Sequence, residues 1–356
     1  MTLKGNKGEW SELYAFFKLL AEGYLYCGDE KLNRYNDIFF PILEIFKDNS
    51  INRNSYKVQH DKKSIFITEE SLNIEIPQEK FNQEASKLLK IIKTMNSNTD
   101  FSYLEDFLTT IGSNNIKAKS SDKADIRIVI HNSKTGLISE LGYSIKSKLG
   151  AASTLINSNK DGTNFIYKIQ GISSEQIKKF NSFNKFKKKF DYLKSINATI
   201  TYHKTANDIL HNNLTLLDLG IEKIIAESLL IYYSGNGRSL AEITDIISQN
   251  DPLQLLNNTK QPMYSFKVKQ FLLAFALGLN SSTPWNGTFD ANGGYIIVKE
   301  DGDIVCYHFF DRNNLENYIF FNTRFETPST SRHNFGNIYL ENNEYFLKLN
   351  LQVRFK

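Results

Sequence analysis

Cysteine is scarce in this sequence, since Cys27 and Cys306 are the only two thiols among 356 residues. Two such distant cysteines supply neither a disulfide framework nor the spacing of a metal site. The apolar stretch at 271–279 has about half the length that a bilayer-crossing helix needs. The N-terminus has no long apolar region followed by a small-residue cleavage site. We therefore expect an intracellular, cytoplasmic protein without a membrane segment.

Several enzyme motifs are also absent. The sequence has no GxSxG, no P-loop and no GxGxxG after a predicted strand. Its six histidines form no HxH pair and no HNH spacing, which excludes a simple zinc motif and a ββα-metal nuclease motif. The net charge is only +4 and the isoelectric point is about 8.7, so an anionic partner is compatible with the balance but not required by it.

One segment departs from this even balance of charge. Residues 178–194 (KKFNSFNKFKKKFDYLK) interleave seven lysines with four phenylalanines. The favoured interpretation is a solvated amphipathic helix whose apolar stripe packs on the protein. The alternative is a face that contacts phosphates.

The N-terminal half alternates helical and strand-like patterns. Residues 8–22 repeat apolar side chains at helical spacing, with Glu9 and Glu12 on one face, and a second helix is predicted over 80–94. The predicted strands of this half are residues 37–46, 64–68, 125–130, 141–146 and 164–169. The order predicts an α/β fold with a mixed central sheet flanked by helices.

The remaining chain changes its periodicity twice. We expect three sections: 1–172 with the mixed sheet, 173–282 mainly helical, and 283–356 rich in antiparallel strands. The last section contains β-like runs such as GYIIVKE, DIVCYHFF, NYIFFNT, GNIYLE and EYFLKLNLQVRF, separated by turns rich in Asn, Asp and Gly.

Charged residues stand inside two of the apolar runs. Asp125 opens one predicted strand, and Ser144 and Lys146, two positions apart, share a face of the next. A carboxylate can hold Mg²⁺, and an ammonium group can stabilise hydroxide or a phosphate transition state. The alternative is structural, with Asp125 capping a turn or pairing with a lysine and Lys146 exposed to solvent.

This arrangement resembles the PD-(D/E)XK nuclease signature, with Ala124-Asp125 at Pro-Asp and Ser144-Ile145-Lys146 at (D/E)-x-Lys. The resemblance implies that Asp125 binds Mg²⁺, Lys146 acts on the water or the phosphate, and Ser144 holds a metal-bound water. Because Ser144 replaces an acid, a second carboxylate must come from elsewhere. The candidates, in order, are Glu9, Glu12 and Glu140. For Glu9, the alternative role is to complement the helix dipole.

Longer segments extend the resemblance from residue 4 to residue 355. KGNKGEWSELYAFFKLLAEGYLY, LGYSIKSKLGAASTLINS, NTRFETPSTSRHNFG and LKLNLQVRF are similar to the HpaII family of type II restriction endonucleases. This implies a nuclease-like core in 1–172 that cleaves double-stranded DNA with Mg²⁺ at a short palindrome, CCGG in the family. It also implies a DNA methyltransferase in the same restriction-modification system. A palindromic site favours a homodimer, although a monomer can nick the strands in turn.

Side chains that read DNA gather near the C-terminus. Arginines serve guanine edges or phosphates, asparagines serve adenine or cytosine edges, and hydroxyl groups serve phosphates. The candidate DNA-binding residues are Lys148, Asn322, Arg324, Ser329, Thr330, Ser331, Arg332, His333, Asn334 and Arg354. For the 322–336 segment, the alternative is ordinary polar surface.

Two other functions compete with a nuclease. A sequence-specific DNA-binding protein with a decayed nuclease site would also carry serine at position 144. An enzyme of another class has no motif to support it, and a purely structural protein would not need these clustered motifs.

Overall fold

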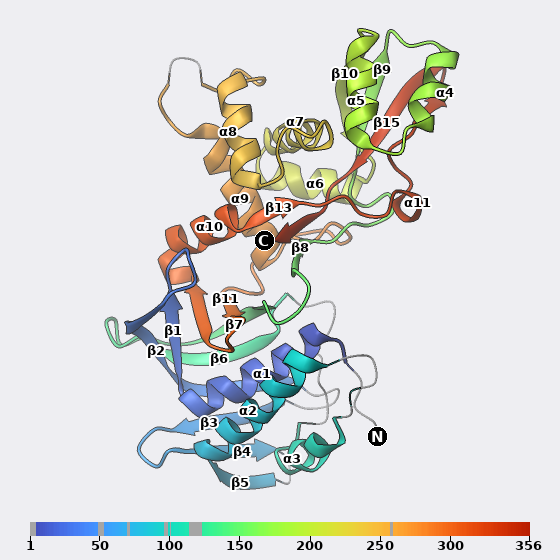
Figure 1. Ribbon diagram of the computed structural model, residues 1–356. Helices are drawn as coiled ribbons and strands as arrows, with labels where there is room; N and C mark the ends of the chain where they lie inside the picture. The colour runs from blue at the N-terminus through green and yellow to red at the C-terminus, as the bar shows by residue number, and fades with distance from the viewer. Residues whose placement is uncertain are drawn as a thin grey trace. The chain divides into compact units, whose positions relative to one another are not determined.

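The computed structural model describes residues 5–48, 53–69, 72–95, 99, 101–113, 123–256 and 259–356. The chain forms two compact units (Figure 1). Unit 1 contains Met1–Ser153 and Phe289–Tyr318, and unit 2 contains Thr154–Thr288 and Ile319–Lys356. These boundaries differ from the three predicted sections, because residues 289–318 return to the sheet of unit 1.

Unit 1 is built on a nine-stranded sheet with the order β1-β12-β11-β7-β6-β2-β3-β4-β5. An additional pairing between β1 and β2 closes the first six strands of this order into a barrel-like ring. Closure is achieved because the long strand β2 pairs with β1 through its first half and with β6 and β3 through its second half. The strands are β1 Tyr24–Gly28, β2 Arg34–Asp48, β3 Arg53–Gln59, β4 Ser64–Glu69, β5 Leu72–Pro77, β6 Ile126–His131, β7 Ile138–Ser147, β11 Gly294–Val298 and β12 Ile304–His308.

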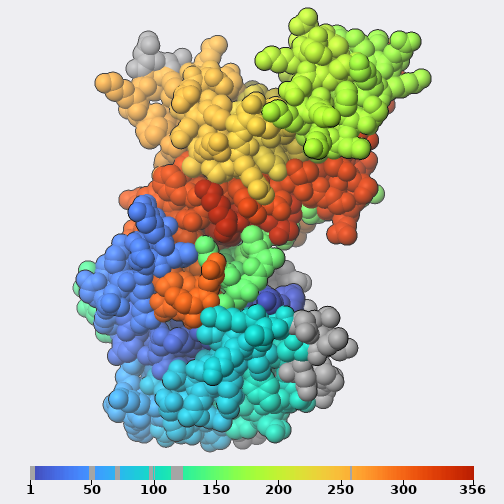
Figure 2. Space-filling model, in the orientation of Figure 1, coloured from blue at the N-terminus to red at the C-terminus, as the bar shows by residue number. Residues whose placement is uncertain are grey.

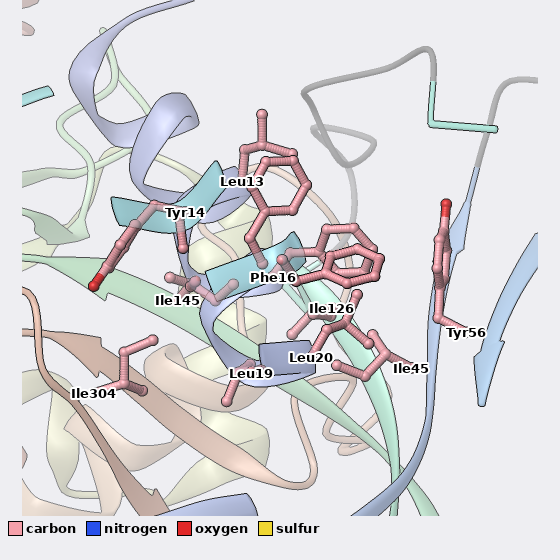
Figure 3. Packing of buried hydrophobic residues seen from close by; sticks show 14 of the residues in the cluster. Leu13, Tyr14, Phe16, Leu19, Leu20, Ile45, Tyr56, Ile126, Ile145 and Ile304 are labelled. Carbon is pink, nitrogen blue, oxygen red and sulfur yellow. The ribbon is translucent and has the colours of Figure 1, made fainter. Parts of the chain in front are cut away.

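Helix α1 (Lys7–Glu22) packs against the sheet of unit 1 and against helix α2 (Gln78–Thr94). Its N-terminus is a capping box in which Asn6 and Glu9 exchange hydrogen bonds, and Gly23 ends it with a φ of 71°. Figure 3 shows Leu13, Phe16 and Leu20 of the helix among buried isoleucines of the strands, including Ile45, Ile126 and Ile145. This apolar layer fixes the helix over the strands, because burial of so many large side chains is the main stabilising term. The unit also contains a 3₁₀ turn at Ser102–Leu104, another (η2) at Phe309–Asp311, and α3 at Glu105–Thr110.

Unit 2 combines helices with two small antiparallel sheets, ordered β10-β9-β15-β14 and β13-β16-β8. Its helices are α4 Ser174–Ser182, α5 Phe186–Ser195, α6 Asp208–Leu217, α7 Ile221–Tyr233, α8 Leu240–Asn250, α9 Met263–Leu277 and α11 Thr330–His333, and α10 (Arg312–Phe321) crosses the boundary between the units. Its strands are β8 Thr154–Ile156, β9 Asn164–Gln170, β10 Thr199–Thr205, β13 Thr323–Phe325, β14 Ile338–Glu341, β15 Glu344–Asn350 and β16 Val353–Phe355. Among the described helices of both units, none has the length and hydrophobicity that a bilayer crossing requires.

The structure confirms a mixed α/β protein and most predicted elements, and it corrects three details. The run NYIFFNT was predicted as a strand, but it lies mostly in helix α10, where Leu315, Tyr318 and Ile319 are buried at helical spacing. The helical middle section contains an unexpected strand, β10. The C-terminal section is not purely antiparallel, because β11 and β12 pair in parallel with β7 and β1. In each case tertiary pairing or packing decided what local propensity left open.

Candidate functional site

Asp125, Ser144 and Lys146 meet at one end of the β6–β7 pair in unit 1. The Asp125 N–H donates to the carbonyl of Tyr143, which fixes the residue just before β6. Its Oδ2 accepts hydrogen bonds from the Ile145 N–H at 2.6 Å and from the Ser144 hydroxyl at 3.1 Å. The three side chains that the sequence singled out are therefore brought together.

Ser144 connects the acid to the lysine. The Lys146 ammonium donates to the Ser144 hydroxyl at 2.7 Å, and its Nζ lies 4.0 Å from Oδ2 of Asp125. Ser144 itself is buried, whereas the Asp125 and Lys146 side chains are 20% and 22% exposed. The Ser144 hydroxyl therefore bridges the Lys146 ammonium and the Asp125 carboxylate through hydrogen bonds. Both charged side chains remain partly exposed, so a ligand can reach them.

Glu12 supplies a second carboxylate beside Asp125. The pKa of Glu12 is raised to about 8, first by burial and then by the negative charge of Asp125, with Glu9 adding to the effect. The ammonium groups of Lys146 and Lys47 oppose this shift. The negative charge of Asp125 disfavours the ionised form of Glu12, and a bound cation would favour it.

The other two candidates for the second acid are engaged elsewhere. The Glu9 carboxylate accepts a hydrogen bond from the Asn6 N–H at 2.8 Å in the capping box of α1. Glu140 forms an ion pair with Arg53 at an exposed position of β7. The geometry therefore favours Glu12 over Glu9, which the sequence placed first.

Two further lysines, which the sequence interpretation missed, belong to this cluster. The pKa of Lys47 is lowered to about 8 by burial, and its shielded Nζ has no hydrogen-bond partner among the described residues. The pKa of Lys123 is also lowered to about 8, by burial and then by the charge of Lys146. Lys47 stands at the end of an apolar run, DIFFPILEIFK. A charged residue beside an apolar run is the signal that identified Asp125, so the sequence could have indicated Lys47 in the same way.

Asp290, which is distant in the sequence, fixes the turn before β6 through hydrogen bonds. Asp290 accepts hydrogen bonds from the backbone N–H groups of Lys123 and Ala124, at 2.7 and 2.8 Å, and binds the Arg127 guanidinium at 2.6 Å. Gly142 has no room for a side chain, because an added Cβ would collide with the Asp290 carbonyl oxygen. The turn that presents Asp125 is thus fixed from two sides.

The donor set suits a hard divalent cation. Mg²⁺ typically takes one or two protein carboxylates and keeps several waters. Asp125 and Glu12 fit this requirement, because the charge of Asp125 helps to raise the pKa of Glu12 and a cation bound nearby would oppose that effect. Within the described ranges, no group of three or more His, Cys, Asp or Glu side chains could hold a metal ion. The site therefore fits Mg²⁺ better than a metal that needs a full set of protein ligands.

Two predicted DNA-binding arginines lie side by side in unit 2. Arg324 on β13 and Arg354 on β16 are directly opposite each other across an antiparallel pair, so their side chains share a face. Glu326 forms ion pairs with Arg324 at 3.2 Å and with Arg238 at 3.3 Å. The sequence interpretation missed Arg238, which joins this face because its carbonyl pairs with the N–H of Phe325. Directly opposed like charges are unfavourable, and the Glu326 carboxylate offsets part of this repulsion.

The segment predicted as a recognition loop forms the short helix α11. Ser329 caps this helix, and its hydroxyl lies 3.3 Å from that of Ser331. Thr330, Ser331 and Arg332 are exposed and available to a partner.

The remaining candidates have structural contacts. Asn334 ends α11 with a positive φ of 49°, and His333 is half-buried with Nε2 at 3.2 Å from the Ser158 hydroxyl. Asn322 follows α10 and is half-buried. Lys148 follows β7, and its N–H donates to the carbonyl of Val298 on β11. Of the predicted DNA-binding residues, Lys148 belongs to unit 1 and all the others belong to unit 2.

Comparison with known proteins connects this arrangement to a family. The model of the HpaII restriction endonuclease family matches residues 6–355. The chain is 41% identical to the type II restriction enzyme HpaII of Haemophilus parainfluenzae over 353 residues, which cover 99% of this chain and 98% of that enzyme. No solved structure matches the chain.

Proposed function

This chain belongs to the HpaII restriction endonuclease family and is a type II site-specific deoxyribonuclease; from that premise we propose that it hydrolyses double-stranded DNA with Mg²⁺ at the palindrome CCGG. The observation that carries the proposal is the cluster of Asp125, Ser144, Lys146 and Glu12 at one end of β6 and β7. Two acids can hold a divalent cation and a lysine can act on the water or the phosphate, so the cluster contains groups that metal-assisted phosphodiester hydrolysis can use.

In the proposed mechanism, Asp125 and Glu12 hold Mg²⁺, which supplies Lewis-acid polarisation of the scissile phosphate when it is bound. One Lys146 N–H is directed to the Ser144 hydroxyl, so its other two N–H groups can orient the attacking water or neutralise the phosphate. The Ile145 N–H and the Ser144 hydroxyl keep the Asp125 carboxylate in place.

We also propose that the β6–β7 pair and helix α1 form a PD-(D/E)XK-type core. Asp125 stands immediately before one strand, Ser144 and Lys146 stand on its antiparallel neighbour, and α1 brings Glu12 to them. Here the second acid comes from the helix, because serine occupies its usual place on the strand.

Recognition of DNA is assigned to unit 2. Arg324, Arg354 and Arg238 gather on one face. Arginine binds guanine edges and phosphates through bidentate hydrogen bonds, which lysine cannot form. Arg332 and the hydroxyl groups of α11 are proposed to contact the backbone of the same DNA.

The biological setting follows from the family. A cytoplasmic enzyme that cuts CCGG requires a DNA methyltransferase of the same specificity to protect the host, and we propose that such an enzyme is its functional partner. A palindromic site also favours a homodimer, in which each copy cuts one strand.

The test is to incubate the purified protein with unmethylated plasmid in Mg²⁺ or in EDTA. Discrete fragments in Mg²⁺ alone support the proposal, and sequencing of their ends defines the site and the cut. A plasmid that is bound at specific sites but never cut would instead support the DNA-binding protein with a decayed nuclease site.

A further inference from the structure

Unit 2 contains a pocket that none of the assigned roles uses. It has a volume of about 560 Å³ and lies between the α4–α5 segment and the stretch from α11 to β14. This volume is within the range of about 300 to 1,000 Å³ that is typical of small-molecule sites. Its lining among the described residues combines four aromatic rings, four asparagines and two lysines, without a carboxylate.

The aromatic wall of the pocket is firmly supported. The rings of Phe186 and Phe335 are nearly parallel, at an interplanar angle of 10° with centroids 5.8 Å apart. Phe186 also packs against Tyr233 at 4.5 Å. Gly336, with a φ of +91°, leaves no room for a side chain, because an added Cβ would lie 2.8 Å from Phe186. Rigid aromatic surfaces of this kind favour a flat ligand that stacks on them.

The polar groups of the pocket offer hydrogen bonds to such a ligand. Lys189 is buried, and its ammonium donates one hydrogen bond to the Gly336 carbonyl and another, at 2.8 Å, to Oδ1 of Asn337. Its third N–H can donate to a ligand. The Tyr339 hydroxyl has no hydrogen-bond partner in the part of the chain that the structure describes. The side chain of Asn184 is exposed at the pocket.

The lysine-rich segment gives this pocket a positive surrounding. Residues 178–194 cover the end of α4 and most of α5, and Figure 2 shows this part of the chain in a yellow-green lobe at the surface. Phe180 and Phe190 are buried as an amphipathic helix requires, whereas Phe183 and Phe186 line the pocket. Exposed lysines of the same segment stand around them, at positions 185, 187 and 188.

These features together select the ligand. A flat aromatic system suits the rings, edge donors and acceptors suit the asparagines, and a negative charge suits the lysines. A nucleotide combines all three. We propose that this pocket receives one nucleotide of the bound DNA, turned out of the duplex, with its base against the aromatic wall and its phosphate toward the lysines. This inference rests on the proposed function, because it takes the nucleotide from the DNA substrate.

The test uses duplexes that contain the mapped site, with a fluorescent base analogue, 2-aminopurine or pyrrolocytosine, at one position at a time. The full-length protein is added in Ca²⁺ in place of Mg²⁺, at a concentration that saturates binding by anisotropy. We expect the fluorescence to rise about threefold or more at one position, because a base that leaves the stack loses its quenching neighbours.

Two variants with the same added ring separate the pocket from the rest of the surface. Asn184→Phe places a ring in the lining of the pocket, at a residue with no assigned contact to DNA, and should abolish the fluorescence rise on fully bound DNA. Ser195→Phe places the ring at the exposed end of α5, outside the pocket, and should leave the rise unchanged. Thermal melting of both variants verifies that they are folded.

Three results overturn the inference. They are saturated binding without a fluorescence rise at any position, an undiminished rise with Asn184→Phe, and saturable binding of free deoxynucleoside monophosphates while every duplex stays silent. All three leave the proposed function intact. A protein that neither binds nor cuts any DNA would instead refute the proposed function.

Discussion

Charged side chains gather on neighbouring elements in both units, but those of the unit 1 cluster are buried groups with shifted pKa values, whereas those of the unit 2 face are arginines. Glu12 has a pKa raised to about 8, and Lys47 and Lys123 have pKa values lowered to about 8, all mainly by burial. In unit 2, Arg324 and Arg354 lie directly opposite each other across an antiparallel strand pair, and Glu326 forms an ion pair with Arg324. The first cluster is therefore sensitive to pH and to a bound cation, whereas the second is an arginine face held in a fixed strand geometry.

This difference matches two different tasks. Hydrolysis needs groups that hold a cation and act on water, and burial tunes such groups. Recognition needs cations that attract DNA under all conditions and keep a fixed geometry. Variants in unit 1 should therefore change the rate of cleavage, and variants in unit 2 should change affinity and site preference.

The strongest test of this separation is to remove the central acid or lysine. Asp125→Asn and Lys146→Ala should each lower the cleavage rate by about 10²- to 10³-fold or more, because each deletes a direct contact to the metal, water or phosphate. Single-turnover cleavage in Mg²⁺ measures the rate, and anisotropy in Ca²⁺ should show unchanged DNA binding. Asp106→Asn, at an exposed position of α3, is the matched control. Cleavage at the normal rate by either active-site variant would refute the assignment.

The next test compares two acids on one helix. Glu12→Gln should lower the cleavage rate about 100-fold and raise the Mg²⁺ concentration needed for half-maximal rate, because a metal ligand is lost. Glu9→Gln should stay within a few-fold of the unaltered enzyme, since glutamine also closes a capping box. The measurement is cleavage as a function of Mg²⁺ concentration. If Glu9→Gln is the impaired variant, Glu9 is the second metal acid after all.

A smaller effect is expected at the arginine face of unit 2. Arg324→Ala should reduce the preference for the cognate site by about 1 to 3 kcal/mol for each lost guanine contact, with little change in the cleavage rate of saturated DNA. Binding is compared between cognate duplexes and duplexes with one altered base pair. Arg332→Ala, on exposed α11, is measured in parallel. Equal weakening on all sequences would identify a phosphate contact instead.

The smallest effect is a pH dependence of stability that belongs to unit 1. Because folding raises the pKa of Glu12 from 4.5 to about 8, the folded protein keeps a proton that the unfolded chain releases, and the free energy of unfolding falls as pH rises between these values. Denaturant melts in EDTA from pH 5 to pH 8 should show this fall. Mg²⁺ or Glu12→Gln should flatten it. An equally steep fall with Glu12→Gln would assign it to another group.

Local signals in the sequence predicted much of the candidate active site. Asp125 and Lys146 were predicted because charges are costly in apolar runs. The structure brings these two residues together through Ser144. The choice between Glu9 and Glu12 could not be made in the same way. Both lie on the same helical face, and the structure distinguishes them by the capping box, which uses Glu9, and by the burial of Glu12 within reach of the charge of Asp125.

Contacts between distant parts of the chain carried no local signal. Asp290 clamps the turn of Lys123 and Ala124 from more than 160 positions away, and Arg238 reaches the Arg324 face through one backbone pairing. Helix α10 was mistaken for a strand, because its tyrosine, isoleucine and phenylalanines have high β propensity.

The sequence by itself determined the α/β composition, most of the helices and strands, and which charged residues needed a partner. These follow from periodicity and from the cost of burying charge, both of which are local properties. Only the tertiary structure decided that β1 closes on β2, that the charge of Asp125 acts on Glu12, and that the phenylalanines of 178–194 divide between a core and a pocket. Those outcomes depend on which surfaces pack against one another, and many packings are compatible with the same pattern of apolar and polar residues.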